Sequence, residues 1–267
     1  MAVVITAQMV KELRDKTDAG MGDCKNALVQ TEGDMQAAID YLRKAGIAKS
    51  ENRQDRATKE GTICTASNGK AAVMVEILCE TDFVAKNEKF LEYAKEAAQR
   101  VLNATSGEGD VTAAAQAQEA EELGALFAKF GEKMILNRAL RMESACIVAP
   151  YVYNGKIALL TEIEGEADET LQKQIGMHIV AYKPMYVRSS EVPADVIEKE
   201  KQIGAAQLAE QGKPAAMIEK IMGGKIQKWF GEICFENQAW MFDDKSTFKK
   251  LYPNVNVVRF VRWVCGE

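Results

Sequence analysis

The stretch AAVMVEILCETDFVAKNEKF, residues 71–90, joins a strand to an amphipathic helix through a short polar and aromatic tip. The run from Ala71 to Leu78 is almost wholly apolar, which is typical of a buried strand. Apolar side chains return at helical spacing from Phe90 to Ala97. A strand that leads directly into such a helix predicts an α+β arrangement around this junction.

The tip at the junction is Thr81-Asp82-Phe83-Val84. Loops between a strand and a helix carry function more often than the elements that they join. Position alone gives Phe83 two interpretations, since it either covers the end of its own core or is presented outward beside Asp82. The sequence pattern leaves both interpretations open.

The composition is that of a folded, soluble protein: of 267 residues, 47% are hydrophobic and 27% are charged. The net charge of −5 argues against broad binding to nucleic acid, which needs a basic surface. We expect no signal sequence and no span of a bilayer, because no apolar run is long enough. The 6 cysteines are scattered, several in apolar runs, so buried thiols in a cytoplasmic protein are expected rather than disulfides.

Residues 1–47 predict three short helices that form a small docking module. Thr6, Asp23 and Asp34 stand where N-caps are expected, each ahead of apolar residues at helical spacing, and the third helix is expected to end at Gly46. A bundle of this size has a thin core, so we expect it to dock on a partner rather than to enclose a site. Residues 48–59 are polar and charged, and they predict a linker.

An internal repeat organises the rest of the chain. Asn68-Gly69-Lys70 recurs as Asn154-Gly155-Lys156, and Glu76-Ile77 recurs at the same offset as Glu162-Ile163. Each Asn-Gly pair separates two strand-like runs, which is the signal of a hairpin with a type I′ turn. A helical stretch follows each hairpin, at 87–102 and at 169–181. Duplication of one α+β unit explains the whole pattern.

The repeat predicts two core subdomains with antiparallel sheets, 60–142 and 143–267. A helical hairpin at about 194–229 interrupts the second, because two helical patterns flank the stop-and-start punctuation Gly212-Lys213-Pro214. The remaining segments predict a solvated helix or loop at 113–124 and strands at 231–235 and 255–264.

The chain lacks the sequence motifs of nucleotide-binding and hydrolytic sites: it has no phosphate loop, dinucleotide fingerprint or nucleophile elbow. Its sole histidine, His178, cannot form a multi-histidine metal site. His178 is either a packed or surface residue, or part of a thiol or acid–base catalyst that folding assembles. Glu76 and Glu162 suggest paired carboxylates, although the repeat explains their spacing without chemistry.

Several stretches resemble a single bacterial family. CETDFVAK at 79–86 fits its Thr-Asp-Phe-Val-Ala-Lys signature, LRDKTDAGMGDCKNAL at 13–28 is similar to its first signature, and MHIVAYKP at 177–184 is similar to its histidine-containing helix. The inserted hairpin resembles the family's protruding coiled coil. By these stretches the chain is identified as a member of the elongation factor Ts family, the nucleotide exchange factors of the GTPase elongation factor Tu.

The sequence also departs from the family's usual residues. Asp18 and Gly22 replace the commoner Gly and Met, and Asn237-Gln238-Ala239-Trp240 replaces Gly-Gln-Pro-Phe. Some members continue beyond the position of Gly266-Glu267 into a further helical module.

The resemblance implies a ubiquitin-associated-like N-terminal module and a chain that binds elongation factor Tu with GDP and speeds GDP release by disrupting its Mg²⁺ and phosphate site. It implies partner binding and Mg²⁺ dislocation by Thr81, Asp82, Phe83 and Val84, and partner binding by Leu13, Gly20, Met21, Met177 and His178. No catalytic residue, metal or cofactor is implied here, because the partner carries GDP or GTP and Mg²⁺.

No membrane or nucleic-acid partner is expected, and a homodimer of the core or a 2:2 complex is compatible with the resemblance. Two alternatives stay open: an RNA- or ribosome-binding module of translation without exchange activity, and an enzyme built around His178.

Overall fold

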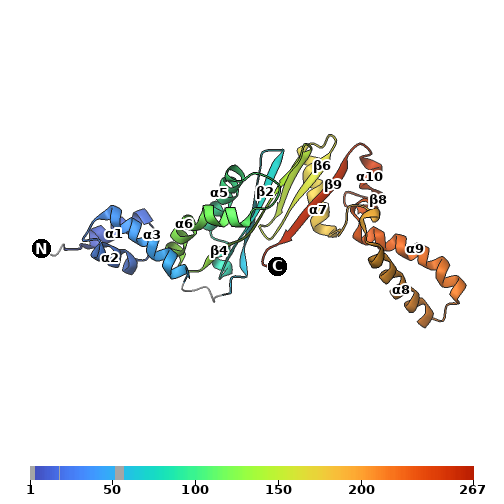
Figure 1. The fold of residues 1–267 in the computed structure, drawn as a ribbon, viewed down its shortest axis with the longest axis horizontal. Helices are drawn as coiled ribbons and strands as arrows, with labels where there is room; N and C mark the ends of the chain where they lie inside the picture. The colour runs from blue at the N-terminus through green and yellow to red at the C-terminus, as the bar shows by residue number, and fades with distance from the viewer. Residues whose placement is uncertain (1–3, 18, 52–56) are drawn as a thin grey trace. The chain divides into compact units, whose positions relative to one another are not determined.

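The computed structural model describes residues 4–17, 19–51 and 57–267, and it has the expected α+β fold (Figure 1). The chain divides into two compact units. Unit 1 consists of Met1–Glu143, Asn154–Ala158 and Trp263–Glu267, and unit 2 consists of Ser144–Tyr153 and Leu159–Arg262.

Three helices open unit 1: α1 (Ala7–Thr17), α2 (Met21–Gln30) and α3 (Met35–Glu51). Two of the expected caps are confirmed, because Thr6 Oγ1 accepts a hydrogen bond from Met9 N (3.3 Å) and Asp34 Oδ1 accepts one from Ala37 N (2.9 Å). The expected cap at Asp23 is wrong, since α2 begins earlier, with Gly20 as its N-cap. The small core of these helices is formed by fully buried side chains, Leu13, Cys24, Ala27, Leu28 and Ala38.

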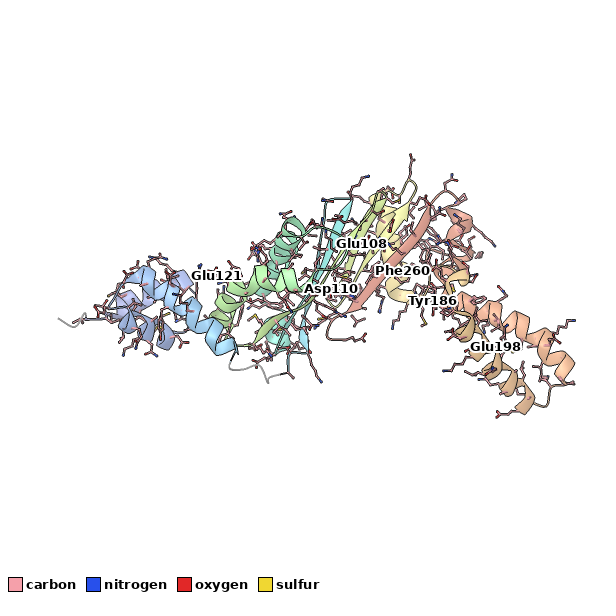
Figure 2. The ribbon with its side chains drawn as sticks, in the orientation of Figure 1. Glu108, Asp110, Glu121, Tyr186, Glu198 and Phe260 are labelled. Carbon is pink, nitrogen blue, oxygen red and sulfur yellow. The ribbon has the colours of Figure 1, made fainter. Side chains whose placement is uncertain are left out.

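Helix α3 does not end at Gly46 as expected but continues to Glu51. It packs against α6 (Thr112–Phe130), where Arg43 Nη1 lies 2.9 Å from Glu121 Oε1; Glu121 is labelled in Figure 2. This packing supports a helix that a glycine would otherwise weaken. The predicted linker, 48–59, therefore includes the end of α3, and its residues 52–56 lie outside the described part of the chain.

The sheet of unit 1 is antiparallel, with the strand order β1-β2-β4-β3. Its strands are β1 (Glu60–Ser67), β2 (Ala71–Cys79), β3 (Gly109–Asp110) and β4 (Met134–Glu143). Every residue of β2 is buried, because β1 and β4 flank it and helix α5 (Glu88–Ala104) packs on it. Helix α5 buries the predicted apolar face, including Phe90 and Ala97.

Helix α6 differs from its expectation, and strand β4 was not predicted. The segment 113–124 is helical, but it is not simply solvated, because α6 buries Ala115 and Glu119 on one face. Strand β4 has no clear apolar pattern in the sequence, because two arginines, Arg138 and Arg141, lie within it. Both arginines make hydrogen bonds inside unit 1. Arg141 Nη1 donates to Leu102 O at 2.7 Å, so a buried arginine interrupts the apolar pattern of the strand.

Unit 2 contains the corresponding three-stranded sheet, with the order β5-β6-β9. Its strands are β5 (Ile147–Tyr153), β6 (Ile157–Glu164) and β9 (Asn256–Val264), and helix α7 (Glu169–Tyr182) packs on β5. Both units thus show a hairpin, a helix and a third strand. The structure confirms the strand predicted at 255–264 and the helix predicted at 169–181.

Each of the two repeated glutamates pairs with an arginine on the neighbouring strand of its own sheet. Glu76 on β2 pairs with Arg138 on β4 (2.8 Å), and Glu162 on β6 pairs with Arg259 on β9 (2.5 Å). The two carboxylates are therefore components of two separate ion pairs, each joining the second and third strands of a sheet. They do not form a catalytic pair with each other.

The two Asn-Gly turns are not alike. Asn154 (φ 51°) and Gly155 (φ 67°) are both left-handed, as a type I′ turn requires. In the first copy only Gly69 is left-handed (φ 89°), and the Asn68 side chain accepts a hydrogen bond from Ala71 N at 2.8 Å. The prediction of a type I′ turn is thus confirmed in the second copy and wrong in the first.

The final residues of the chain complete unit 1. Gly266 N donates to Glu76 Oε1 (2.9 Å), and Arg138 Nη2 donates to Val264 O (2.9 Å). The guanidinium of Arg138 also lies over the ring of Trp263, 4.4 Å from its centroid. Because Glu76 is fully buried, the last residues provide part of the hydrogen bonding that its carboxylate needs.

The inserted hairpin consists of α8 (Ala194–Glu210) and α9 (Ala215–Ile233), which continues past the predicted end at Trp229; Figure 2 labels Glu198 on α8. Gly204 allows a close crossing, since an added Cβ would lie 2.8 Å from Met222 Cε. The strand predicted at 231–235 is wrong, because α9 extends through most of it. The apolar side chains there reflect burial at the base of the hairpin, where Phe230 and Cys234 pack together.

The remaining elements are short. They are α4 (Asp82–Ala85), η1 (Ser189–Glu191), η2 (Phe235–Asn237), β7 (Ala239–Trp240), β8 (Asp243–Thr247) and α10 (Phe248–Leu251). All six cysteines are free, and four of them are buried. Within the described ranges, no helix is both long and apolar enough to cross a membrane.

Candidate functional site

The predicted tip forms a single helical turn, α4, at the end of β2. Val84 and Ala85 face the core of unit 1 and are buried there. Phe83, between Asp82 and Val84, is 83% exposed. The interpretation in which Phe83 covers its own core is therefore wrong. A turn that is anchored by its buried residues holds one aromatic ring out into solvent.

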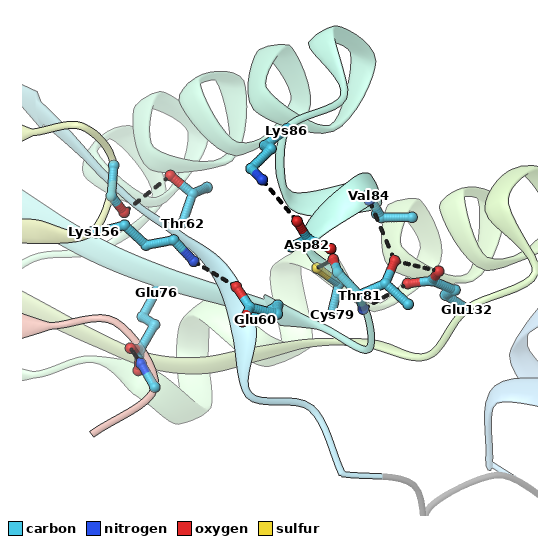
Figure 3. Close-up of polar contacts among 12 residues, drawn as sticks. Glu60, Thr62, Glu76, Cys79, Thr81, Asp82, Val84, Lys86, Glu132 and Lys156 are labelled. Carbon is cyan, nitrogen blue, oxygen red and sulfur yellow. Dashed lines mark hydrogen bonds and ion pairs between the residues drawn. The ribbon is translucent and has the colours of Figure 1, made fainter.

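Thr81 fixes the start of this turn through hydrogen bonds in two directions (Figure 3). Its Oγ1 accepts from Val84 N (3.4 Å) and donates to Glu132 Oε1 (2.6 Å). The other oxygen of Glu132 accepts from Thr81 N (3.1 Å). Because the carboxylate only accepts, it orients the hydroxyl so that a lone pair faces the turn. Glu132 thus supports the N-cap from outside the turn.

A third hydrogen bond joins the same two loops in the opposite direction. Glu80 Oε1 accepts from Lys133 N at 2.7 Å. The adjacent residues Glu80 and Thr81 are therefore attached to the adjacent residues Glu132 and Lys133 by both side chains and backbone. Sequence reasoning missed these contacts, because the partners are more than 50 positions apart in the chain and Glu132 belongs to no recognisable pattern.

The carboxylate beside Phe83 is paired. Lys86 Nζ donates to Asp82 Oδ2 at 2.7 Å, one turn along the chain (Figure 3). This hydrogen bond lowers the pKa of Asp82, and it raises that of Lys86. The charge of Lys156, which pairs with Glu60 at 2.8 Å, lowers the pKa of Asp82 further. The tip therefore presents an ionised carboxylate next to an exposed aromatic ring.

The thiol below the tip is not a nucleophile. Cys79 is fully buried, and its Sγ donates to Thr81 O at 3.2 Å. Burial raises the pKa of this thiol to about 12, so it stays protonated near neutral pH. In the described part of the chain, no three His, Cys, Asp or Glu side chains are grouped as a metal site would need.

The residues predicted to bind a partner through the N-terminal helices are not all at the surface. Met21, at the start of α2, is 56% exposed, and Gly20 before it is exposed as well. Leu13 is fully buried in the core of the three helices. Its side chain supports the surface around Met21 instead of forming part of it.

The predicted pair on α7 is divided in the same way. Met177 is 37% exposed, whereas the ring of His178 is fully buried in unit 2. It stacks between Tyr182 (4.6 Å between ring centroids) and Trp240 (4.9 Å). Burial lowers the pKa of His178 to about 4, so the ring is neutral near pH 7. The expectation that this ring is itself a surface contact is corrected by its position.

Gln238 lies in the stretch 237–240, which departs from the family's usual residues, but sequence reasoning assigned it no role. Its Oε1 lies 3.0 Å from His178 Nε2, and its side chain is buried. The structure thus brings residues 81–84 together as one tip, while Gly20 with Met21 and Met177 with His178 belong to two other places in the chain.

Comparison with known proteins gives one consistent result. The family model described as "Elongation factor TS" matches residues 80–267. A protein named "Elongation factor Ts" from Thioalkalivibrio sulfidiphilus (strain HL-EbGR7) is 42% identical over 274 residues, which cover 99% of this chain and 93% of that protein.

Two relatives with the same name come from Xanthomonas oryzae pv. oryzae (strain PXO99A) and Xanthomonas campestris pv. campestris (strain B100). Each is 40% identical over 271 residues, which cover 98% of this chain and 92% of the relative. The similarity thus extends over both units and includes the tip.

Proposed function

This chain belongs to the elongation factor Ts family of translation elongation factors, and from that premise we propose that it is a guanine nucleotide exchange factor. It binds elongation factor Tu loaded with GDP and accelerates GDP release, so that GTP can bind. The observation that carries the proposal is the 83% exposure of Phe83 on a turn whose other residues are buried or hydrogen-bonded. A large apolar side chain held in solvent by a fixed turn favours contact with a partner.

The thermodynamics of exchange need no chemistry from this chain. Mg²⁺ that bridges the nucleotide phosphates is a main reason why GTPases hold GDP tightly. A factor that binds the nucleotide-free partner more strongly than the GDP-bound partner weakens GDP binding by the same ratio. Phe83 acts here as an apolar wedge beside the Mg²⁺ site of the partner, and Asp82 is the polar group next to it.

The fixed geometry of the tip favours this role. A flexible loop would lose conformational entropy when it binds, and that loss would reduce the affinity for the partner. Here Val84 and Ala85 are already packed in the core of unit 1, and Glu132 already holds Thr81. The free energy gained when the ring of Phe83 is buried in the partner is therefore available to displace the partner's own groups.

Two further surfaces take part in the proposed binding. Gly20 and Met21 contact the GTPase domain of the partner, and Met177 contacts a second surface of the partner. Leu13 and His178 contribute from below, because their side chains are buried under these surfaces. GDP, GTP and Mg²⁺ are carried by the partner, and this chain forms no covalent intermediate.

The test is the rate at which a fluorescent GDP leaves elongation factor Tu, with the wild-type chain and with Phe83→Ala. We expect the variant to slow release about tenfold or more, since a central aromatic contact contributes about 2 kcal/mol. Its melting temperature should stay close to that of the wild type, because Phe83 packs little against its own core.

Ile203→Ala is the matched control, since it removes another exposed apolar side chain, on α8 of the hairpin. It should leave both the release rate and the melting temperature unchanged. A wild-type chain that does not accelerate release contradicts the proposal. A Phe83→Ala variant that melts much earlier, yet still exchanges normally while folded, contradicts the wedge.

A further inference from the structure

The one histidine of this chain has both ring nitrogens engaged inside unit 2. His178 Nε2 lies 3.0 Å from Gln238 Oε1, and His178 Nδ1 lies 3.3 Å from Met241 N. The histidine and the glutamine are both buried, so water does not replace these contacts. The protons on the ring are therefore determined by the protein groups around it.

The amide of Gln238 can face only one way. Its Nε2 lies 2.8 Å from Glu232 O and 3.3 Å from Tyr182 O, and carbonyl oxygens only accept. The amide nitrogen must therefore point at these carbonyls, which leaves Oε1 pointing at the histidine. Since Oε1 also only accepts, His178 Nε2 carries the ring proton. Met241 N donates to the bare Nδ1, which is consistent with the same tautomer.

This pair of side chains connects three segments that are separated in sequence. Tyr182 ends α7, Glu232 lies in the last turn of α9, and Met241 follows β7. The side chain of Gln238 donates to the backbone carbonyls of Tyr182 and Glu232. The ring of His178 accepts from the backbone N–H of Met241. The imidazole ring also stacks on the side chain of Tyr182. The end of α7, the base of the inserted hairpin and the turn after β7 are thus held by two neighbouring residues.

A set of exposed large apolar side chains lies on α7, on the turn after β7 and at Met185, between α7 and η1. The set consists of Met177, Tyr182, Met185, Met241 and Phe242. Met185 N donates to Ile233 O at 2.8 Å, and the ring of Phe242 lies 5.5 Å from that of Trp240, which stacks on His178. These contacts attach the exposed side chains to the segments that the pair holds. We refer to these five residues as the apolar rim.

We propose that Gln238 is a positioning residue, which keeps His178 in the Nε2-protonated form and thereby holds the apolar rim in one arrangement for the partner. This inference rests on the proposed function, because it identifies how the surface around Met177 is kept ready to bind elongation factor Tu. It replaces a direct contact by His178 with a buried support. The rim then provides affinity, while Phe83 provides the disruption of the nucleotide site.

The first measurement is nuclear magnetic resonance of the chain labelled with ¹⁵N-histidine. A single histidine gives an unambiguous signal, and the coupling pattern distinguishes a protonated nitrogen from a bare one. We expect the wild type to show a proton on Nε2 and none on Nδ1 at neutral pH. In Gln238→Leu the acceptor for Nε2–H is gone, so the ring should show a mixture of forms. A wild-type ring protonated on Nδ1 would overturn the assignment.

The second measurement separates binding from exchange on the intact chain. The GDP-release rate is recorded against the concentration of wild type and of Gln238→Leu. We expect the half-saturating concentration to rise about fivefold or more, while the rate at saturation stays within about twofold, because the tip is untouched. Phe83→Ala should show the reverse, a lower rate at saturation.

Leu159→Ala is the control for a general loss of stability. Leu159 is fully buried in the same core and takes no part in these side-chain hydrogen bonds. It should lower the melting temperature without the rise in half-saturating concentration. If Gln238→Leu does not fold, Gln238→Glu keeps the size and the acceptor for Nε2–H but cannot donate to Tyr182 O and Glu232 O, and the loss of these two bonds should give the same rise.

The outcomes are distinct. A wild-type chain without exchange activity removes the proposed function and this inference with it. An active wild type together with Gln238 variants that bind equally well removes this inference alone. A rise in half-saturating concentration that Leu159→Ala matches would also overturn it, because loss of core packing would then explain the effect.

Discussion

At the scale of single residues, one hydroxyl group decides how the tip is presented. Thr81 is an ordinary N-cap toward Val84, but its proton is directed to Glu132. A cap that donates to a carboxylate cannot rotate away from the turn without losing a charge-assisted hydrogen bond. The orientation of Phe83 is thus set by a glutamate that does not neighbour it in sequence.

We predict that Glu132→Gln slows GDP release severalfold, while it lowers the free energy of unfolding by only about 1 kcal/mol. The amide supplies one acceptor and one donor where Thr81 needs two acceptors, so the turn is held less firmly. Release kinetics and a thermal melt on one preparation provide the check. Glu121→Gln, which alters an exposed ion pair on α6, serves as the control and should behave as the wild type. Unchanged release in Glu132→Gln would show that the tip does not depend on this support.

The single histidine should also make stability depend on pH. Burial lowers the pKa of His178 to about 4 in the folded chain, whereas the unfolded value is about 6.5. Between these values the unfolded chain binds more protons, so this contribution to stability is complete above pH 6.5 and is lost as pH falls toward 4.

We expect the free energy of unfolding to fall by about 2 kcal/mol more in the wild type than in His178→Gln between pH 8 and pH 5. Denaturant melts of both chains across this range measure the difference. The comparison of slopes matters, because the variant also loses packing at every pH. Parallel curves for the two chains would show that the histidine is not buried as described.

At the scale of elements, the inserted hairpin has a separable outer part and an anchored base. Near its base, Ile226, Phe230 and Cys234 pack with Val192 in one cluster. Glu232 in the last turn of α9 also accepts the hydrogen bond from Gln238. The outer part, roughly residues 201–221, mostly packs on itself.

Replacing residues 201–221 by a short Gly/Ser linker should therefore leave one cooperative unfolding transition, because shortening a surface insertion has a small entropic effect. Removing the whole segment from Ala194 to Trp229 should lower the melting temperature, because Phe230 and Cys234 lose their partners. Thermal melts followed by circular dichroism test both deletions. A broad, non-cooperative transition in the shorter deletion would show that the whole hairpin belongs to the core.

The elements that the sequence predicted are those whose apolar residues form a clear pattern along the chain. Helix α5 buries one apolar face at helical spacing, and strand β2 is a continuous apolar run that is buried along its whole length. Strand β4 was missed because Arg138 and Arg141 are hydrogen-bonded within unit 1. The segment 231–235 was misassigned because a continuous apolar run does not distinguish a strand from the buried end of a helix.

The candidate site shows the same limit. Residues 81–84 could be selected from the sequence because they are contiguous and resemble a known signature. Glu132, which supports Thr81, and Gln238, which supports His178, could not be selected, because they act through contacts between distant positions, and a single sequence carries no record of such pairs. Exposure was equally hidden: His178 and Met177 are adjacent in sequence, yet only Met177 reaches the surface.

At the scale of the whole molecule, the last residues of the chain return to unit 1. Residues 263–267 belong to this unit, although all of unit 2 precedes them in the chain. Their removal would take away the Gly266 hydrogen bond and the Trp263 ring from the Glu76–Arg138 pair. When a buried carboxylate loses a hydrogen-bond donor, the folded state becomes less stable.

We predict that the free energy of unfolding of a chain ending at Arg262 is about 1–3 kcal/mol lower than that of the full chain. Adding Glu76→Gln to the shortened chain should recover part of this loss, because a neutral amide needs fewer donors. Denaturant melts of the three chains provide the comparison. Equal stability of the full and shortened chains would show that the last residues do not complete unit 1. Sedimentation of the full chain separately tests whether it forms the homodimer that the resemblance allows.

The position of residues 263–267 also determines when the factor can mature during its own synthesis. A ribosome makes the tip early, and domains generally fold as units in the order in which they emerge. Here the sheet below the tip still lacks Trp263 and Gly266 when every residue of unit 2 has been made. A nascent chain therefore carries an exposed Phe83 before Trp263 and Gly266 have joined the sheet of unit 1, and that sheet gains its full stability only when residues 263–267 have been added.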